Sequence, residues 1–355
     1  MHPLMSVRLI ISIVFFVTML ACVQKKEISN SSTENVKAPA GMTWIPGGEF
    51  TMGTDDPQSY DHEKPAHRVK VDGFWMDETE VTNLQFKNFT DATQYVTTAE
   101  KAPDWNELKK QLPPGTPMPE KELLVAGSVI FNPPSYAVSL DDYSKWWSWK
   151  PQADWRHPQG PESNLEGKWN HPVVHVSFDD AVAYCKWAGK RLPTEAEWEF
   201  TSRDGKENLT FSWGNEMKPN GKIMANTYQG AFPVKNLIED GFESTSPVKS
   251  FPANQYGLYD LIGNCWEWTS DFYDVSYYKE CSKKGVVVNP TGADQSYDPN
   301  EPLAEKYVTR GGSFLCSTDY CSNYRPSARQ ASARDTGMSH IGFRCVVDRK
   351  MLTEK

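Results

Sequence analysis

Turn-forming residues recur so densely along this chain that they limit what it can fold into. The 355 residues include 23 glycines and 25 prolines, roughly one residue in seven. Because both residue types interrupt regular secondary structure, this density favours a loop-rich fold over a helical bundle or a parallel-sheet protein. The 13 Trp, 15 Tyr and 16 Phe supply an aromatic core and exclude a disordered chain. We therefore expect a loop-rich α+β domain with little regular secondary structure.

The charge balance and the missing motifs exclude several classes of function. The chain carries 37 basic and 46 acidic side chains, which give a formal net charge of −9 at pH 7. Because nonspecific nucleic-acid binding needs a basic face, we expect no nucleic-acid partner. The sequence has no GxxxxGK[ST], no GxGxxG after a strand, no HExxH and no GxSxG. Nucleotide, hydrolase and ordinary zinc sites are therefore not expected.

The N-terminus is typical of an export signal. Residues 9–21 read LIISIVFFVTMLA, an apolar run that is too short for a transmembrane helix, which needs about 20 such residues. Arg8 supplies a basic flank, and the small Ala21 stands directly before Cys22, as in bacterial lipoprotein signals. We expect residues 1–22 to be a lipoprotein signal in which Cys22 is lipidated; an ordinary secretory signal with an incidental cysteine is the alternative.

Export sets the expected location and redox state. The polar residues 23–40 contain no core-forming pattern and are expected to tether the folded part to the lipid anchor in the bacterial cell envelope, facing the periplasm or in the outer membrane. Disulfides are possible in that compartment. The other cysteines are Cys185, Cys265, Cys281, Cys316, Cys321 and Cys345. Six cysteines allow 15 full pairings, and the sequence alone does not choose among them.

Residues 41–350 are expected to form one domain, because no internal repeat and no linker divides them. Alternating residues at 68–72 predict a strand. Residues 101–145 include the proline-rich text QLPPGTPMPEK and FNPPSY, which indicates an insertion or surface excursion.

Three short helices are predicted from their capping residues. Thr82 with Gln85 three positions later fits a capping box. Ser177 and Thr194 each stand directly before a run with helical composition, and Thr194 follows Pro193.

The cysteines Cys316 and Cys321 stand five positions apart. An extended strand would separate them by about 16 Å and a helix by about 7.5 Å, whereas a disulfide needs Cα atoms within about 7 Å. The intervening Ser317-Thr318-Asp319 forms turns, so a loop would bring the two sulfurs together. Taken alone, the pair is either a plain disulfide or a pair of soft thiolate ligands that favours Cu(I).

Several longer motifs resemble the formylglycine-generating enzymes, also called sulfatase-modifying factors, over nearly the whole chain after the signal. The C-terminal run RGGSFLC…YC…GFRC is similar to their active-site segment, and its two cysteines in LCSTDYC are selective for the oxidase branch. The matching segments are IPGGEFTMGTDDPQ at 45–58, MDETEVTN at 76–83, WRHPQGPES at 155–163, HPVVHVSFDDAVAYCKWAGKRLPTEAEWEF at 171–200, YGLYDLIGNCWEWTSD at 256–271 and residues 310–345.

This resemblance implies a formylglycine-generating-enzyme fold of the C-type-lectin-like kind and an oxidoreductase that uses O2. Cys316 and Cys321 would bind Cu(I), and the substrate would be a cysteine in a Cys-x-Pro-x-Arg segment of an unfolded or nascent sulfatase polypeptide. The substrate thiolate would join the metal, and oxidation at its β-carbon followed by hydrolysis would leave Cα-formylglycine. The reaction would also consume a thiol reductant.

Three further residues match active-site positions of that family. Ser313 would hydrogen-bond a polar group near the metal, although a turn hydroxyl after Gly311-Gly312 is an equal alternative. Tyr320 and Trp266 match aromatic positions near the site, and plain core packing is the alternative for each.

The resemblance also implies two structural Ca²⁺ sites. Calcium takes six to eight oxygen ligands in irregular geometry, which suits loop-borne side chains and carbonyls. Solvated acids on turns are the alternative. The first site would use Asn226 and Asp240 side chains with the carbonyls of Thr227 and Phe242; the second would use Asp260 and Glu267 side chains with the carbonyls of Gly263 and Cys265.

One disulfide is implied by the same resemblance. Cys185 and Cys345 match a structural disulfide of the animal enzymes, whereas Ser202 and Pro326 replace both partners of a second one. Cys265 and Cys281 are additions to the family pattern, and their pairing stays open.

A non-catalytic envelope lipoprotein that uses the same fold for binding or structure is the alternative function. Such a protein has no evident reason to keep Cys316 and Cys321 as a pair. Iron-dependent sulfoxide synthesis would require clustered histidines on a helix, which this chain lacks.

Overall fold

The computed structural model describes residues 37–207 and 209–353; the expected signal, Cys22 and most of the expected tether lie outside them. The strands are β1 (Met42–Ile45), β2 (Gly48–Met52), β3 (His67–Val71), β4 (Phe74–Asp77), β5 (Gly127–Phe131), β6 (Trp147–Pro151), β7 (Gly230–Ala231), β8 (Lys235–Asn236), β9 (Trp266–Phe272), β10 (Val287–Val288), β11 (Lys306–Arg310), β12 (Arg329–Ala333), β13 (Ile341–Gly342) and β14 (Val346–Val347).

The helices of the described residues are short. The α-helices are α1 (Asn83–Thr93), α2 (Trp105–Leu108), α3 (Phe178–Trp187), α4 (Glu195–Ser202), α5 (Tyr277–Cys281) and α6 (Arg349–Thr353). Single 3-10 turns lie at Asp61–Glu63, Thr98–Glu100, Lys109–Gln111, Lys121–Leu123, Tyr143–Lys145 and Pro219–Gly221. Between residues 37 and 353, leaving out residue 208, no helix has the length and apolarity needed to cross a bilayer.

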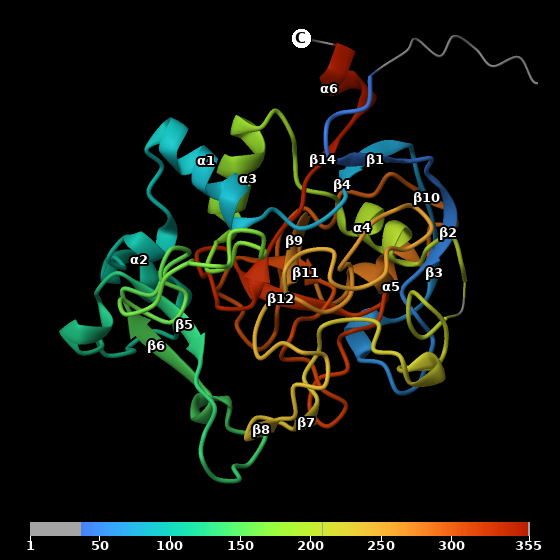
Figure 1. The fold of residues 1–355 in the computed structure, drawn as a ribbon. Coiled ribbons are helices and arrows are strands. Elements are labelled where there is room, and N and C mark those ends of the chain that lie inside the picture. The colour runs from blue at the N-terminus through green and yellow to red at the C-terminus, as the bar shows by residue number, and fades with distance from the viewer. Residues whose placement is uncertain (1–36, 208, 354–355) are drawn as a thin grey trace, which may run out of the picture. The chain divides into compact units, whose positions relative to one another are not determined.

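A small mixed sheet in the order β12-β11-β9-β13 lies at the centre of the molecule (Figure 1). β9 pairs antiparallel with β11 and parallel with β13. The sheets β1-β4-β14 and β10-β3-β2 lie on one side of it, and the hairpins β5-β6 and β7-β8 complete the strand pairing. Long irregular segments connect these elements, so the expected loop-rich α+β fold is confirmed.

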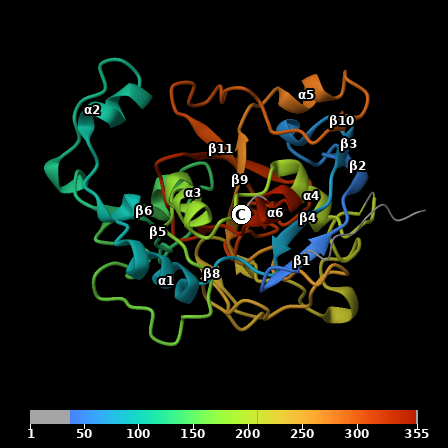
Figure 2. The same ribbon diagram turned by 90° about the horizontal axis from the view of Figure 1, so that it is seen from above.

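The predicted caps begin the predicted helices. The Oγ of Thr82 accepts from the Gln85 N–H at 3.3 Å at the start of α1. Ser177 and Thr194 begin α3 and α4 in the same way. α1 and α3 lie side by side in both views (Figures 1 and 2), with Phe86 stacked on Tyr184 at 5.9 Å between ring centroids. Short-range capping therefore fixes these helices.

The proline-rich insertion is more ordered than a surface excursion. Its C-terminal part, with the residues that follow it, forms the hairpin β5-β6, in which Val129 faces Trp149 and Phe131 faces Trp147 across the strands. Cross-strand aromatic and β-branched pairs stabilise such a hairpin. Of the two predicted alternatives, an insertion or a surface excursion, the structure favours the insertion: residues 98–151 form a lobe of the fold, seen at the left of both views (Figures 1 and 2).

Two hydrophobic clusters fill the interior. The larger one lies between the sheets and helices and contains Trp198, Trp266, Trp268 and Cys316. The smaller cluster consists of Trp146, Tyr228, Phe232, Phe314 and Leu315. Because this second cluster joins the insertion lobe to the segment just before Cys316, it fixes the lobe beside the candidate site.

Candidate active site around Cys316 and Cys321

The two cysteines lie in the connection between β11 and β12, residues 311–328, which we call the cysteine loop. Arg310 and Arg329 face each other at its two ends. Both are buried and both bind Glu195 on α4, Arg310 at 2.8 Å and Arg329 at 2.7 Å. Removing one partner of a buried ion pair costs about 3–5 kcal/mol. The ends of the loop are therefore held firmly on α4.

Glycine lets the two arms of the loop approach closely. Gly312 has a φ of +72°, in the left-handed region, and a Cβ there would lie 3.1 Å from the Cys316 Sγ and 2.9 Å from the Asn323 carbonyl oxygen. Any other residue would be strained and crowded at this position. The Cys321 N–H then donates to the Ser317 carbonyl at 3.0 Å and closes the turn.

The loop brings the two sulfur atoms into contact. The Sγ atoms of Cys316 and Cys321 are 3.0 Å apart, and both residues are free thiols in this structure. Cys316 is buried, whereas Cys321 is partly exposed. The Nδ2–H of Asn323 donates to the Cys321 Sγ at 3.0 Å. The sequence singled out both cysteines but missed Asn323, although it stands only two positions away.

The surroundings make the two thiols unequal. Burial raises the pKa of the Cys316 thiol well above its usual value. A hydrogen bond from Cys316 lowers the pKa of the Cys321 thiol, and hydrogen bonds from Asn323 act in the same direction. Since a thiolate is the form that attacks or binds soft metals, these opposite shifts favour Cys321 over Cys316 as the thiol that loses its proton first.

Three phenol rings stand around this pair. Tyr320, on the loop directly before Cys321, stacks on Phe232 at 4.7 Å and meets Trp146 edge to face at 5.4 Å. Burial raises the pKa of Tyr324 to about 12. Burial and the Cys321 charge also raise the pKa of Tyr60. All three phenols are therefore neutral at physiological pH.

The two other predicted site residues have structural contacts. The Ser313 Oγ accepts from the Leu315 N–H at 3.2 Å, and its carbonyl accepts from the Cys316 N–H at 2.9 Å. Ser313 is therefore a turn residue that also positions Cys316. Trp266 is fully buried on β9, in the larger cluster that also contains Cys316.

An arginine network fixes the far arm of the cysteine loop. Arg325 binds Glu63 at 2.7 Å, Ser59 at 2.5 Å and the Ser327 Oγ at 3.2 Å. Sequence reasoning missed this network, because 262 positions separate Arg325 from Glu63 and no local pattern links them.

The donor set around Cys316 fits a soft metal ion. In the described part of the chain, no three His, Cys, Asp or Glu side chains converge closely enough to hold a metal ion. Two adjacent sulfurs, one of them reachable from solvent, form an incomplete set of the softness that Cu(I) prefers. A third soft ligand from outside would complete that set.

The residues of the first predicted calcium site lie close together in the structure. Asp240 accepts from the Thr227 N–H at 3.2 Å and from the Phe242 N–H at 2.9 Å. The Oδ1 of Asn226 is buried and has no hydrogen-bond partner. Leaving such an atom unpaired costs free energy, and a bound cation would satisfy it. The Asn226 oxygen therefore fits a cation, whereas Asp240 and the Thr227 carbonyl already accept hydrogen bonds from Gln229.

The second predicted calcium site is assembled in part. The Oδ1 of Asp260 is buried without a partner, and burial raises the pKa of this carboxyl to about 6. Glu267, by contrast, accepts from Arg344 on both oxygens, at 2.7 and 2.8 Å. Glu80, which sequence reasoning missed, also has a buried unpaired oxygen and acts electrostatically on Asp260. The unpaired oxygens fit a cation, but Glu267 is already engaged.

The remaining cysteines fall into one pair and two single thiols. The Sγ atoms of Cys185 and Cys345 are 3.1 Å apart in the core; both are free thiols here, and the implied disulfide between them stays a prediction. Cys265 lies against Glu80, its Sγ 3.9 Å from a carboxylate oxygen, and Cys281 ends α5. Both are free thiols.

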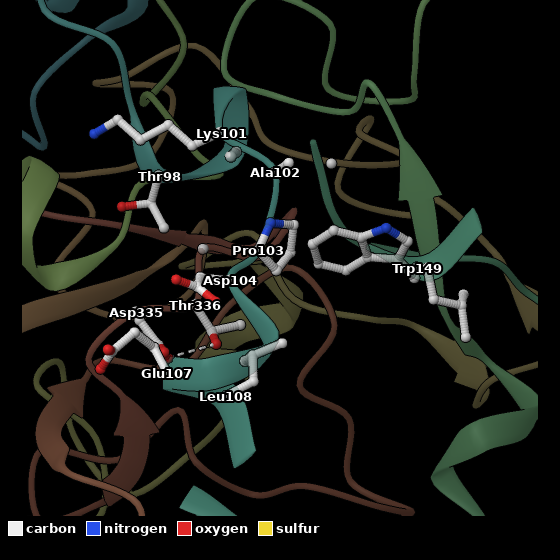
Figure 3. A pocket seen from close by; sticks show the side chains of 14 residues that line it. Thr98, Lys101, Ala102, Pro103, Asp104, Glu107, Leu108, Trp149, Asp335 and Thr336 are labelled. Atoms are coloured by element: carbon white, nitrogen blue, oxygen red, sulfur yellow. Dashed lines mark hydrogen bonds between the residues drawn. The ribbon is translucent and has the colours of Figure 1, made fainter. Parts of the chain in front are cut away.

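The insertion lobe contains a cavity of about 490 Å³ with an acidic side. Figure 3 shows the Trp149 ring beside Pro103, while Asp104, Glu107 and Asp335 gather on the other side. Lys101 also lines the cavity. The arrangement suits a side chain with an apolar stem and a positive end. We call it the acidic cavity.

A family model described as the sulfatase-modifying factor enzyme 1-like domain matches residues 27–349. A formylglycine-generating enzyme from Mus musculus is 44% identical over 309 residues, which cover 86% of this chain and 75% of the mouse protein. One from Mycobacterium tuberculosis is 44% identical over 305 residues, 86% of this chain and 96% of that protein.

Two other similarities extend this comparison. A Mus musculus protein named inactive C-alpha-formylglycine-generating enzyme 2 is 38% identical over 307 residues, 86% of this chain and 84% of that protein. The solved structure of PvdO from Pseudomonas aeruginosa has a TM-score of 0.55 at 24% identity, covers 86% of this chain and 93% of that one, and supports the fold alone.

Proposed function

The chain belongs to the sulfatase-modifying factor family, and we propose that it converts a cysteine in Cys-x-Pro-x-Arg segments of sulfatases to Cα-formylglycine with O2 and Cu(I). The observation that carries this proposal is the Cys316–Cys321 contact at 3.0 Å, with Cys321 partly exposed and hydrogen-bonded by Asn323. A purely structural pair has no need of exposure or of such a donor.

The proposed reaction balances in atoms and electrons. The substrate β-carbon loses two electrons and two reductant thiols lose one each, while O2 accepts four and becomes water. Water then replaces the sulfur, which leaves as H2S, and the aldehyde remains. When bound, Cu(I) supplies a soft redox centre at which a substrate thiolate and O2 react.

The residues of this chain prepare the site for that chemistry. Cys316 gives up the proton on its Sγ when a metal binds, because metal ligands must be deprotonated. Asn323 orients the Cys321 sulfur through its amide N–H. Tyr320, backed by Trp146 and Phe232, forms an apolar wall that limits water beside the sulfurs.

The acidic cavity supports recognition of the substrate arginine. Asp104 offers a carboxylate to a guanidinium, and Trp149 offers a flat ring beside its aliphatic stem. Glu107 and Asp335 add negative charge, although Glu107 also pairs with Lys110 at 2.6 Å and Asp335 accepts from Gln111 at 2.7 Å. The strand β5 leads from this cavity at Gly127 toward Phe131, which contacts the smaller cluster behind Tyr320. Five residues of strand span about 13 Å, as far as cysteine and arginine lie apart in an extended Cys-x-Pro-x-Arg segment.

A peptide-oxidation assay tests the proposal. Purified protein lacking the signal, loaded with Cu(I), should convert a Cys-x-Pro-x-Arg peptide in the presence of O2 and a thiol reductant. Mass spectrometry reads the replacement of H2S by oxygen. Turnover that persists in the Cys316→Ser and Cys321→Ser variants would show that the site is elsewhere, and absence of turnover in the loaded parent protein would favour the non-catalytic alternative.

We also propose that Cys22 is lipidated and anchors the protein in the cell envelope. The apolar run of residues 9–21 and the Ala21-Cys22 junction support this. Inhibition of lipoprotein signal peptidase should leave an unprocessed precursor in membranes, and normal processing under inhibition would contradict it.

A further inference from the structure

A second cavity, of about 540 Å³, lies at the other end of the hairpin β5-β6. Three aromatic residues line it, and charged side chains stand among the other lining residues. We call it the basic cavity. Its lining includes Phe131, Tyr228, Phe314, Lys168, Lys235 and Glu243.

The wall of the basic cavity is also the support of the cysteine loop. The Tyr228 N–H donates to the Cys316 carbonyl at 2.9 Å, and Phe314 precedes Cys316 by two positions. The Phe232 ring meets Tyr228 at 5.2 Å and stacks on Tyr320 at 4.7 Å. The cavity and the two sulfurs therefore share one aromatic layer.

The two cavities differ in charge. The acidic cavity is lined by three carboxylates and one lysine. In the basic cavity, Lys168 and Lys235 stand against the single acid Glu243. Within residues 37–207 and 209–353, neither lysine has a carboxylate oxygen within 4.0 Å of its amine, whereas Lys190, Lys249 and other lysines are paired. Lys168 is partly buried and Lys235 is exposed, so their unpaired ammonium groups present positive charge that attracts a carboxylate.

We propose that the basic cavity binds an acidic residue on the N-terminal side of the substrate cysteine. This inference rests on the function proposed above. If the substrate arginine occupies the acidic cavity, the chain passes along β5 to the cysteine loop and continues, on the N-terminal side, into the basic cavity. The protein would then recognise three groups of the substrate segment, from its N-terminal side: a carboxylate, the reactive cysteine and an arginine.

Peptides with different N-terminal flanks test this inference. Each carries Ser in place of the reactive cysteine and Glu, Gln or Lys at the positions two to four before it, and fluorescence anisotropy measures its affinity. We expect the Glu peptide to bind about two- to tenfold more tightly than the Gln peptide, and the Lys peptide least tightly, with differences that shrink as salt rises.

Variants of the two lysines provide the control. The Lys168→Gln/Lys235→Gln protein should bind Glu and Gln peptides equally, while Lys284→Gln, at an exposed lysine that does not line the cavity, should keep the preference. In turnover assays with the corresponding cysteine peptides, the Glu peptide should have the lowest KM and the Lys peptide the highest, with little change in kcat. Equal binding by the parent protein, or a preference that survives the double substitution, would overturn the inference. If no peptide binds or reacts, whatever its N-terminal flank, the result would instead overturn the proposed function itself.

Discussion

Two pairs of sulfur atoms lie at almost the same separation in this molecule, 3.1 Å for Cys185 and Cys345 and 3.0 Å for Cys316 and Cys321. The first pair joins α3 to the residue before β14 and is buried on both sides. The second lies in one loop and opens to solvent at Cys321. Separation alone therefore does not distinguish a structural pair from a reactive one.

The difference lies in what surrounds each pair. Burial raises the pKa of Cys345 well above its usual value, and Cys185 is almost fully covered. Cys321 has an amide donor in Asn323, and its pKa is lowered. A thiol that is both accessible and partly ionised reacts, whereas a buried neutral thiol is inert. Exposure and a hydrogen-bond donor, then, distinguish the proposed reactive pair from the core pair.

Replacement of the reactive pair should give the largest effect. Cys316→Ser or Cys321→Ser should lower peptide turnover more than about 100-fold. Even the replacement of a residue that only hydrogen-bonds to a metal ligand lowers metal affinity or activity by about 10–100-fold. The Cys185→Ser/Cys345→Ser protein is the matched control and should keep most of its turnover under conditions where it is folded. Similar losses of turnover in both proteins would erase the distinction between the pairs.

Replacement of the core pair should act on stability instead. Under oxidising conditions, Cys185→Ser/Cys345→Ser should lower the free energy of unfolding by about 2–5 kcal/mol, measured by urea denaturation, because a disulfide between them would close a long loop. Added reductant should remove most of the difference from the parent protein. A difference that reductant does not change would mean that the core pair stabilises by packing rather than as a disulfide.

Removal of calcium should lower stability without touching either sulfur pair. A cation at 100 times its dissociation constant stabilises by about 2.7 kcal/mol, so chelation should lower Tm, measured by calorimetry. Asn226→Ala should reduce this dependence on calcium, because it removes an unpaired buried oxygen of the first site. A Tm that does not respond to calcium in the parent protein would contradict both sites.

The smallest expected effect comes from replacing Asn323, whose side-chain amide donates a hydrogen bond to the Cys321 sulfur. In metal-free protein, Asn323→Ala should slow alkylation of Cys321 by iodoacetamide about two- to tenfold at pH 7, because a tenfold change in thiolate corresponds to one pKa unit. The lowered pKa of Cys321 makes its alkylation rise at lower pH than that of an ordinary cysteine, and the substitution should move this rise to higher pH. Ser322→Ala serves as the neighbouring control. An unchanged pH profile of alkylation would show that Asn323 does not lower the pKa of the Cys321 thiol.

Local features of the fold followed from the sequence, because the interacting residues are close along the chain. Thr82 caps α1 through a residue three positions away, and the Gly311-Gly312 turn and both reactive cysteines lie within one loop. Such short-range contacts depend on few other residues. The insertion shows the limit, since its prolines concealed the hairpin β5-β6, and its buried Trp146 packs against Tyr320 of the cysteine loop.

The sequence by itself determined the residue types of the site: two soft thiols five positions apart, and oxygen-bearing residues on loops that suit calcium. Only the tertiary structure decided which thiol is partly exposed and has a lowered pKa, that Glu63 holds Arg325 across 262 positions, and that Glu267 is already bound by Arg344. The reason is physical: burial and charge pairing depend on neighbours brought together by packing, and no local pattern encodes those neighbours.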